Sequence, residues 1–145
     1  MRLVLLSGPD GTIVDFDLVP ADTPEREAGL VLLERQPLRG QLLLCDKGFA
    51  GREFEHAVSE LRALVVRPSR ADEPERPEPA IGWIRQRIES IVQTLKDPLC
   101  LEQHLAKSPA GLSARILARI VALCAAIHLN WQLGKPPREL VGYRY

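Results

Sequence analysis

The chain has 145 residues, which suffice for one hydrophobic core but not for two ordinary domains. Hydrophobic residues make up 46% and charged residues 26%, and this globular composition excludes global disorder and a coiled coil. The net charge is zero, but residues 1–79 hold 10 Lys and Arg against 15 Asp and Glu, whereas residues 80–145 hold 9 against 4. The basic second half favours a polyanionic partner, although ordinary scatter of surface charge explains it as well.

Three cysteines, Cys45, Cys100 and Cys124, lack the spacing of a metal site or a disulfide framework. This argues against a zinc site and predicts a reducing location, the cytoplasm. No uninterrupted apolar run reaches the roughly 20 residues that a membrane-spanning helix needs, and the first residues lack a signal-peptide pattern. We therefore expect a soluble cytoplasmic protein that makes no membrane contact.

The first predicted elements in chain order are two strands over residues 2–7 and 12–19. The sequence Gly-Pro-Asp-Gly at 8–11 joins them and is a strong signal for a hairpin turn. A helix over about 25–35 follows, because a proline and acidic residues favour its first turn and the proline at 37 stops it.

Residues 41–45 are apolar on both faces, which is typical of a central strand in a layered α/β sheet. A helix from about Arg52 and a short strand over 63–66 come next. This alternation predicts that the short strand joins the sheet in parallel. The segment 68–79 is rich in proline and in charged residues, and we expect it to form a flexible loop.

Two amphipathic helices are predicted in the second half. The first covers 83–96 and has a buried stripe at helical spacing, formed by Ile84, Ile88, Ile91 and Leu95. The second covers 109–133 and carries its apolar face on Leu112, Ile116, Ile120, Leu123, Ile127 and Trp131. A glycine and two prolines end it, and we expect 134–145 to be a loosely held tail.

Asp46 and Glu89 are the first candidate site residues. Asp46 follows the strand at 41–45, and ligand sites of α/β sheets gather at the carboxyl ends of strands; a simple turn residue is the alternative. Glu89 shares one helix face with Arg85 and Lys96. This face fits a metal-binding carboxylate between two phosphate-binding cations, and it also fits a solvated surface with ion pairs.

These residues resemble the catalytic core of the DDE insertion-sequence transposases. The sequence LLLCDKGF at 42–49 is similar to the strand of that family that ends in D-x-G-[YF]. The spacing Arg85-x(3)-Glu89-x(6)-Lys96 is similar to its helix signature R-x(3)-E-x(6)-K. The last predicted helix is similar to the closing helix of the family, which often ends in an Asn-Trp pair such as the one at 130–131.

The resemblance implies an α/β fold of the ribonuclease-H-like type, with a mixed sheet and helices on both faces. Residues 1–133 would be a partial catalytic domain that lacks the first strand. Asp46 and Glu89 would be catalytic and would bind Mg²⁺ or Mn²⁺, while Arg85 and Lys96 would contact double-stranded DNA at transposon ends. No small-molecule substrate is expected, homo-oligomerisation is left open, and a DNA-bound protein would lie with the nucleoid.

The chain also departs from the family pattern. Gly82 stands where the family often has a tyrosine, and the first catalytic Asp belongs on a strand before the hairpin. All the aspartates near the start lie after that position, so we expect a truncated and inactive fragment whose sheet has an open edge along 2–7 or 41–45. If the chain were active, Asp17 would be the first candidate to replace the missing carboxylate.

Two other functions compete with this interpretation. The first is a non-catalytic remnant that binds DNA or a transposase subunit. The second is a generic ribonuclease-H-like nuclease, which shares the carboxylates but does not explain the spacing of Arg85 and Lys96.

The histidines, scattered over separate helices, are expected to have surface or core roles: His56, His104 and His128.

Overall fold

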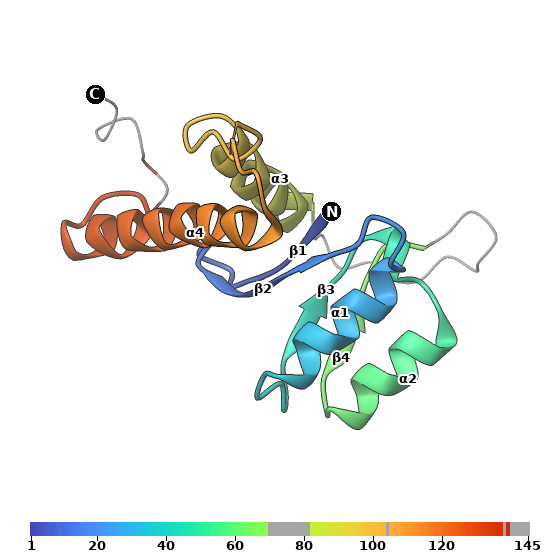
Figure 1. The fold of residues 1–145 in the computed structure, drawn as a ribbon. Helices are drawn as coiled ribbons and strands as arrows, with labels where there is room; N and C mark the ends of the chain where they lie inside the picture. The colour runs from blue at the N-terminus through green and yellow to red at the C-terminus, as the bar shows by residue number, and fades with distance from the viewer. Residues whose placement is uncertain (70–81, 104, 138, 140–145) are drawn as a thin grey trace. The chain divides into compact units, whose positions relative to one another are not determined.

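The computed structural model describes residues 1–69, 82–103, 105–137 and 139 (Figure 1). Its elements are β1 (Arg2–Ser7), β2 (Ile13–Val19), α1 (Glu25–Glu34), β3 (Leu42–Leu44), the 3-10 turn η1 (Lys47–Phe49), α2 (Arg52–Glu60), β4 (Leu64–Val66), α3 (Gly82–Lys96) and α4 (Pro109–Gln132). They form two compact units. The first comprises Met1–Leu5 and Asp15–Ile81, and the second comprises Leu6–Val14 and Gly82–Tyr145.

The predicted hairpin is confirmed, since β1 and β2 form a two-stranded sheet. In its turn the Gly8 amide donates to the Thr12 carbonyl at 2.8 Å, and the Gly11 amide donates to the Gly8 carbonyl at 3.1 Å. Gly11 has a φ of 100°, a conformation that glycine adopts without strain. The carboxylate of Asp10 accepts from the amide and the hydroxyl of Thr12, so the side chain closes the turn.

The parallel pairing predicted for the first unit is also confirmed. β3 and β4 pair in parallel, with Leu42 opposite Leu64 and Leu44 opposite Val66. The helix between them, α2, packs against β4 and against α1. The apolar faces of these elements form the core of the unit: Ala28, Leu32, Leu33, Leu38, Leu43, Ala50, Phe54, Val58 and Ala63.

The described strands pair two by two. Within the residues that the structure covers, they form two separate two-stranded sheets, so the α/β class holds, while the ribonuclease-H-like arrangement stays a prediction. Of the two edges predicted to be open, the one along 41–45 has no second partner strand among the described residues, where β3 pairs with β4 alone. Gln41 and Cys45 hydrogen-bond to β4, so Leu42 and Leu44 direct their backbone groups away from it. Leu42 is 64% exposed, which differs from the buried central strand that its sequence predicts.

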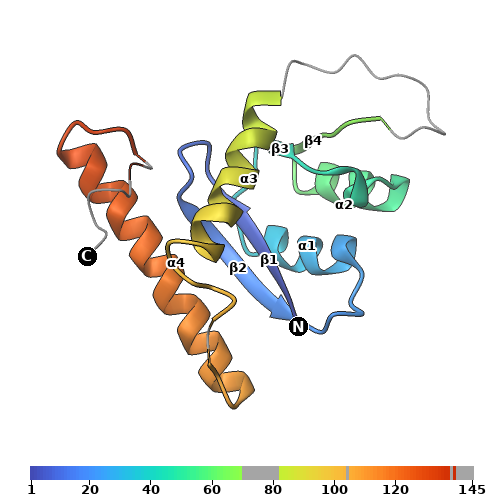
Figure 2. The ribbon, with the colours of Figure 1, turned by 90° about the horizontal axis from the view of Figure 1, so that it is seen from above.

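The second unit contains α3 and α4, which contact each other and lie side by side in Figures 1 and 2. Ser108 begins α4, because its hydroxyl oxygen accepts from the Gly111 amide at 3.1 Å. Arg119 of α4 donates from Nε to the carbonyl oxygen of Leu99 at 2.8 Å, in the turn that follows α3. This contact ties the two helices together near the carboxyl-terminal end of α3.

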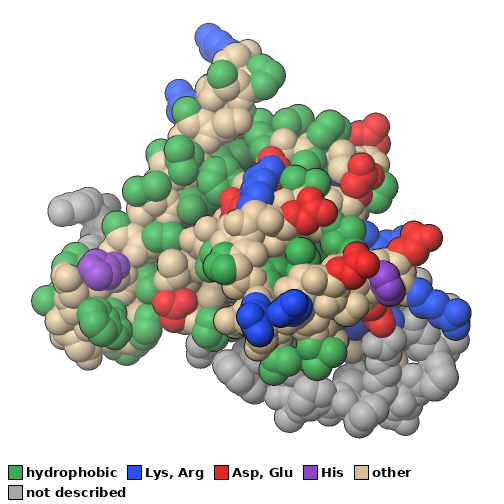
Figure 3. All heavy atoms as spheres, turned by 90° about the horizontal axis from the view of Figure 1, so that it is seen from below, with side chains coloured by type: hydrophobic (Ala, Val, Ile, Leu, Met, Phe, Trp, Pro, Cys, Tyr) green, Lys and Arg blue, Asp and Glu red, His purple; other side chains and the backbone are tan. Residues whose placement is uncertain are grey.

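The predicted buried stripe of α3 is partly wrong. Ile91 and Leu95 are buried, but Ile88 is 41% exposed. The side chain of Ile84 lies outside the described part of the structure. Figure 3 shows one face of the protein, on which hydrophobic side chains (green) reach the surface among the charged ones.

On α4 the prediction is right at four of its six positions, while Leu112 is only half-buried and the last position is wrong. The buried side chains are spaced by four, three, four and three residues: Ile116, Ile120, Leu123, Ile127 and Asn130. Trp131 is 72% exposed, because each residue turns the helix by about 100° and Asn130 takes the inward position. By length and composition alone α4 could cross a membrane, and 22% of its most apolar stretch is buried inside the protein.

Several predictions lie outside the described residues. They concern 70–79 of the proline-rich segment, His104, and most of the tail, at 138 and 140–145. At the start of the tail, the Asn130 amide nitrogen Nδ2 donates to the carbonyl oxygens of Pro137 at 3.2 Å and Glu139 at 3.0 Å. The first tail residues are therefore held against the end of α4.

Candidate functional site

Asp46 lies directly after β3, at the carboxyl end of the parallel pair. Its side chain is exposed, and its Oδ1 accepts from the Lys47 amide at 2.7 Å. This bond caps η1, whose first amide would otherwise lack a partner within the turn. The turn role of Asp46 is therefore shown, and the predicted strand-end position is confirmed. Its catalytic role stays a prediction.

The loop after Asp46 is fixed on α1. Phe49 packs its ring on the backbone of Gly29 in the middle of that helix, in a space that a Cβ would fill. The same ring contacts Phe54, with ring centroids 5.3 Å apart. Arg26 donates from Nη1 to the Ala50 carbonyl oxygen at 3.0 Å. Helix α1, which contributes no predicted site residue, thus determines where the turn bearing Asp46 lies.

An ion pair formed by a buried arginine and a half-buried glutamate lies at the neighbouring strand end. Arg67 follows β4 directly and is opposite Cys45 in the parallel register. Its Nη2 is 2.8 Å from Oε1 of Glu55, and its side chain is only 1% exposed. The sequence did not indicate this pair, because an arginine after a short strand is indistinguishable from a surface residue. The pair joins the end of β4 to α2.

Cys45, the residue before Asp46, has a perturbed thiol. Burial raises its pKa to about 11, and the nearby charge of Arg67 opposes part of that rise. Cys45 is therefore a neutral thiol at physiological pH and not an activated nucleophile. The residue is half-buried at the end of β3.

Glu89 has an exposed side chain on α3, as a ligand-binding carboxylate requires. Lys96 ends the same helix, and its Nζ lies 2.9 Å from Oε1 of Glu102. The hydrogen bond to Glu102, together with the charge of that carboxylate, raises the pKa of Lys96. The side chain of Arg85 lies outside the described residues. The predicted DNA contact Lys96 thus has an acidic partner that spacing alone did not reveal.

Asp46 belongs to the first unit and Glu89 to the second, and each unit is described by itself. The predicted approach of the two carboxylates to a shared metal therefore stays a prediction. Oxygen ligands of this kind suit Mg²⁺ and Mn²⁺. Over the ranges that the structure describes, no group of three His, Cys, Asp or Glu side chains is placed to hold a metal ion.

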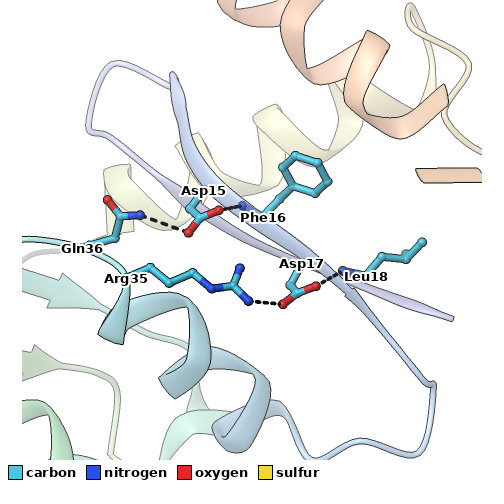
Figure 4. Close-up of polar contacts among 6 residues, drawn as sticks. All are labelled: Asp15, Phe16, Asp17, Leu18, Arg35 and Gln36. Carbon is cyan, nitrogen blue, oxygen red and sulfur yellow. Dashed lines mark hydrogen bonds and ion pairs between the residues drawn. The ribbon is translucent and has the colours of Figure 1, made fainter. Parts of the chain in front are cut away.

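Two aspartates of β2 are bound to the end of α1 (Figure 4). Oδ2 of Asp17 accepts from Nη2 of Arg35 at 2.9 Å, and Oδ2 of Asp15 accepts from Nε2 of Gln36 at 3.0 Å. In each case Oδ1 accepts from the next backbone amide at 2.8 Å. Both carboxylates attach β2 to α1. Asp17, the first candidate to replace the missing catalytic carboxylate, is therefore already paired with Arg35.

The two described histidines lie on exposed helix surfaces. Nδ1 of His56 is 3.8 Å from the Glu60 carboxylate one turn further along α2. His128 lies near the end of α4, with its Nε2 3.1 Å from Nε2 of Gln132. Both positions agree with the surface roles that the sequence favours.

Comparison with protein-family models gives a match over most of the chain. The family model described as the transposase DDE domain matches residues 1–125, which include Asp46, Glu89, Arg85 and Lys96. No curated protein and no solved structure matches the chain.

Proposed function

Because the chain belongs to the DDE transposase family, whose general function is DNA transposition, we propose that its part in this process is metal-dependent cleavage and transfer of DNA strands. The observation that carries the proposal is Asp46. Its exposed carboxylate stands at the carboxyl end of a parallel strand, on a turn that α1 holds in place. A rigidly placed carboxylate at such an edge is what a metal site in an α/β fold requires.

Asp46 and Glu89 would hold the divalent cation, Mg²⁺ or Mn²⁺, in this proposal. Both are exposed carboxylates with the hard oxygen donors that these ions prefer. When bound, the cation supplies positive charge that stabilises displacement at phosphorus. The protein contributes the fixed turn at Asp46 and the helical position of Glu89. Two carboxylates alone bind such an ion weakly, which supports a third ligand from elsewhere.

Arg85 and Lys96 would bind the phosphates of double-stranded DNA at the transposon ends. The ion pair of Lys96 with Glu102 is exposed on both sides, and exposed pairs of this kind contribute little stability. A phosphate can therefore replace Glu102 as the partner of Lys96 at small cost. Release of counterions on binding would make the affinity depend on salt.

We expect residues 1–145 alone to be inactive in strand cleavage. The family's first Asp has no matching position here, and the aspartates of β2 are engaged with α1. The alternative is a non-catalytic remnant that binds DNA or a transposase subunit. The open edge of β3 favours the subunit-binding form of this alternative, because unpaired edges accept strands from other chains.

A nicking assay with Mn²⁺ tests the proposal. It compares the chain alone, the chain supplied with a strand segment that carries an Asp, and the supplied chain with Asp46→Ala. We expect cleavage only in the second sample. DNA binding without cleavage in all three would favour the non-catalytic remnant, and cleavage that survives Asp46→Ala would refute the site.

A further inference from the structure

The turn that carries Asp46 is a single hydrogen-bonded unit. The Phe49 amide donates to the Asp46 carbonyl oxygen at 3.0 Å, and the Ala50 amide donates to the Lys47 carbonyl oxygen at 3.0 Å. At the start of the turn, the Asp46 carboxylate accepts from the Lys47 amide. Because these bonds link the first residue of the turn to the last, a contact at Ala50 also restricts Asp46.

Two charged side chains from the first turn of α1 lie against this unit. Arg26 donates from Nη1 to the Ala50 carbonyl oxygen, and a Cβ at Gly51 would come within 2.5 Å of the same Nη1. A Cβ at Gly48 would overlap Oε2 of Glu25. The absence of a side chain at both glycines therefore leaves room for α1 to contact the turn.

The two contacts differ in strength. Ala50 is buried, and the hydrogen bond that its carbonyl oxygen accepts comes from a charged donor, which makes it the stronger kind. Oε1 of Glu25 lies 3.8 Å from Nη1 of Arg2 on β1, at an exposed position. Such exposed pairs contribute little, so Arg26 is the main polar support of the turn.

The position of Arg26 is unfavourable for a cation site on electrostatic grounds alone. A guanidinium is always charged, and it repels a divalent cation that binds at the same turn. An arginine without a structural role here would therefore weaken the metal site. The hydrogen bond to Ala50 supplies such a role, because a carboxylate held in one orientation binds a metal ion better than a mobile one.

We propose that Arg26 is a positioning residue, which orients the Asp46 carboxylate for a divalent cation through the Ala50 carbonyl. The proposal rests on the proposed function in that Asp46 is the metal ligand. It predicts the sign of an effect: loss of Arg26 weakens metal binding, whereas loss of a cation that only repels the metal strengthens it.

A titration with Mn²⁺ followed by NMR tests this sign. Paramagnetic Mn²⁺ broadens the amide signals of Lys47 and Gly48 when it binds at Asp46, so that even weak binding is detected at this site. The variant Arg26→Ala is compared with Arg52→Ala, which removes an exposed arginine just after the same turn. Arg26 is exposed and alanine favours a helix, so the fold should persist, and circular dichroism verifies it.

We expect Arg26→Ala to weaken Mn²⁺ binding by about tenfold, the low end of the range for contacts that support metal ligands. Arg52→Ala should leave the affinity unchanged or raise it. Arg26→Lys keeps the charge and a donor of similar reach, so it should recover most of the loss. In metal-free Arg26→Ala, the Phe49 and Ala50 amides should exchange with solvent faster than in the parent.

Four results would overturn the positioning role. Unchanged or tighter Mn²⁺ binding by Arg26→Ala would refute it and leave Asp46 as a metal ligand. Unchanged exchange of the Phe49 and Ala50 amides would refute it as well. An equal loss of affinity in Arg26→Ala and Arg52→Ala would show that the hydrogen bond is not the cause. Broadening that is absent from the parent, or that survives Asp46→Ala, would refute the proposed metal site itself.

Discussion

The ring of Phe49 lies against the backbone of Gly29 so closely that an added Cβ would come within 2.6 Å of ring atom Cε1. This contact connects the middle of α1 to the turn that carries Asp46. The glycine is therefore required for space, in a helix where alanine would otherwise be preferred.

Gly29→Ala should destabilise the protein by about 1–2 kcal/mol. Overpacking costs about 1–3 kcal/mol, and the better helix propensity of alanine returns up to about 1 kcal/mol. Urea unfolding measures the change. Phe49→Leu in the same background should recover part of the loss, and Glu27→Ala on the exposed side of α1 is the control. A Gly29→Ala protein more stable than the parent would show that the ring moves aside freely.

Asn130→Ala should lower the free energy of unfolding by about 1–3 kcal/mol, since it removes two buried hydrogen bonds to the tail carbonyls. The same variant should make the chain after Gly134 more sensitive to protease. Gln132→Ala, two residues away and exposed, is the control for helix propensity. Equal protease sensitivity of parent and variant would show that the tail is held by other contacts.

Asn130→Asp should be destabilised in a pH-dependent manner. A buried carboxylate facing two carbonyl oxygens is favoured only when protonated, so folding would raise its pKa above the ordinary value of about 3.9. The folded protein would then bind the proton more tightly than the unfolded chain, and stability would fall as the pH rises above about 4. Unfolding curves at several pH values for Asn130→Asp and Asn130→Ala would separate this effect from simple loss of the bonds.

Replacing Arg85 and Lys96 together with alanine should weaken duplex DNA binding and reduce the slope of log affinity against log salt by about two phosphate contacts. Fluorescence anisotropy between about 50 and about 200 mM salt gives the slope. Arg39 and Arg52, two exposed arginines of the first unit, provide the matched double replacement. An unchanged slope would show that Arg85 and Lys96 are solvated charges on the helix that do not contact the phosphates.

Glu102→Gln should strengthen DNA binding if Lys96 contacts phosphate. The change removes the carboxylate that now pairs with Lys96, and it lowers the pKa of Lys96 toward its ordinary value without discharging it at neutral pH. We expect a gain of a few-fold in affinity at low salt that disappears in the Lys96→Ala background. A gain that persists without Lys96 would reflect only the altered net charge of the surface.

The sequence predicted the elements whose ends carry local signals. The turn at Gly11, the start and end of α1, and the parallel pairing of β3 with β4 all follow from turn chemistry and alternation. The last inward residue of α4 could not be read off hydrophobicity, because the polar Asn130 takes that position through bonds to a tail that lies later in the chain. By polarity alone, the apolar Trp131 was expected to take the inward position.

The sequence predicted the residues of the candidate site but not the contacts that hold them in place. Asp46 was recognisable because a charged residue after an apolar strand and before a glycine turn is a local pattern. The contacts that fix its loop involve side chains that are distant in the sequence. Gly29 matters only through the ring of Phe49, and Arg67 only through Glu55, and neither relationship leaves a spacing in the sequence.

The open edge of β3 provides a way in which such a protein could be activated by an added strand. Parallel strands end at the same border of a sheet, so a strand added in parallel beside Leu42 and Leu44 would end next to Asp46. A side chain at that end would stand beside the Asp46 carboxylate. Completing the sheet and completing the acidic set would then be a single event, and the supply of one strand would control both folding and chemistry.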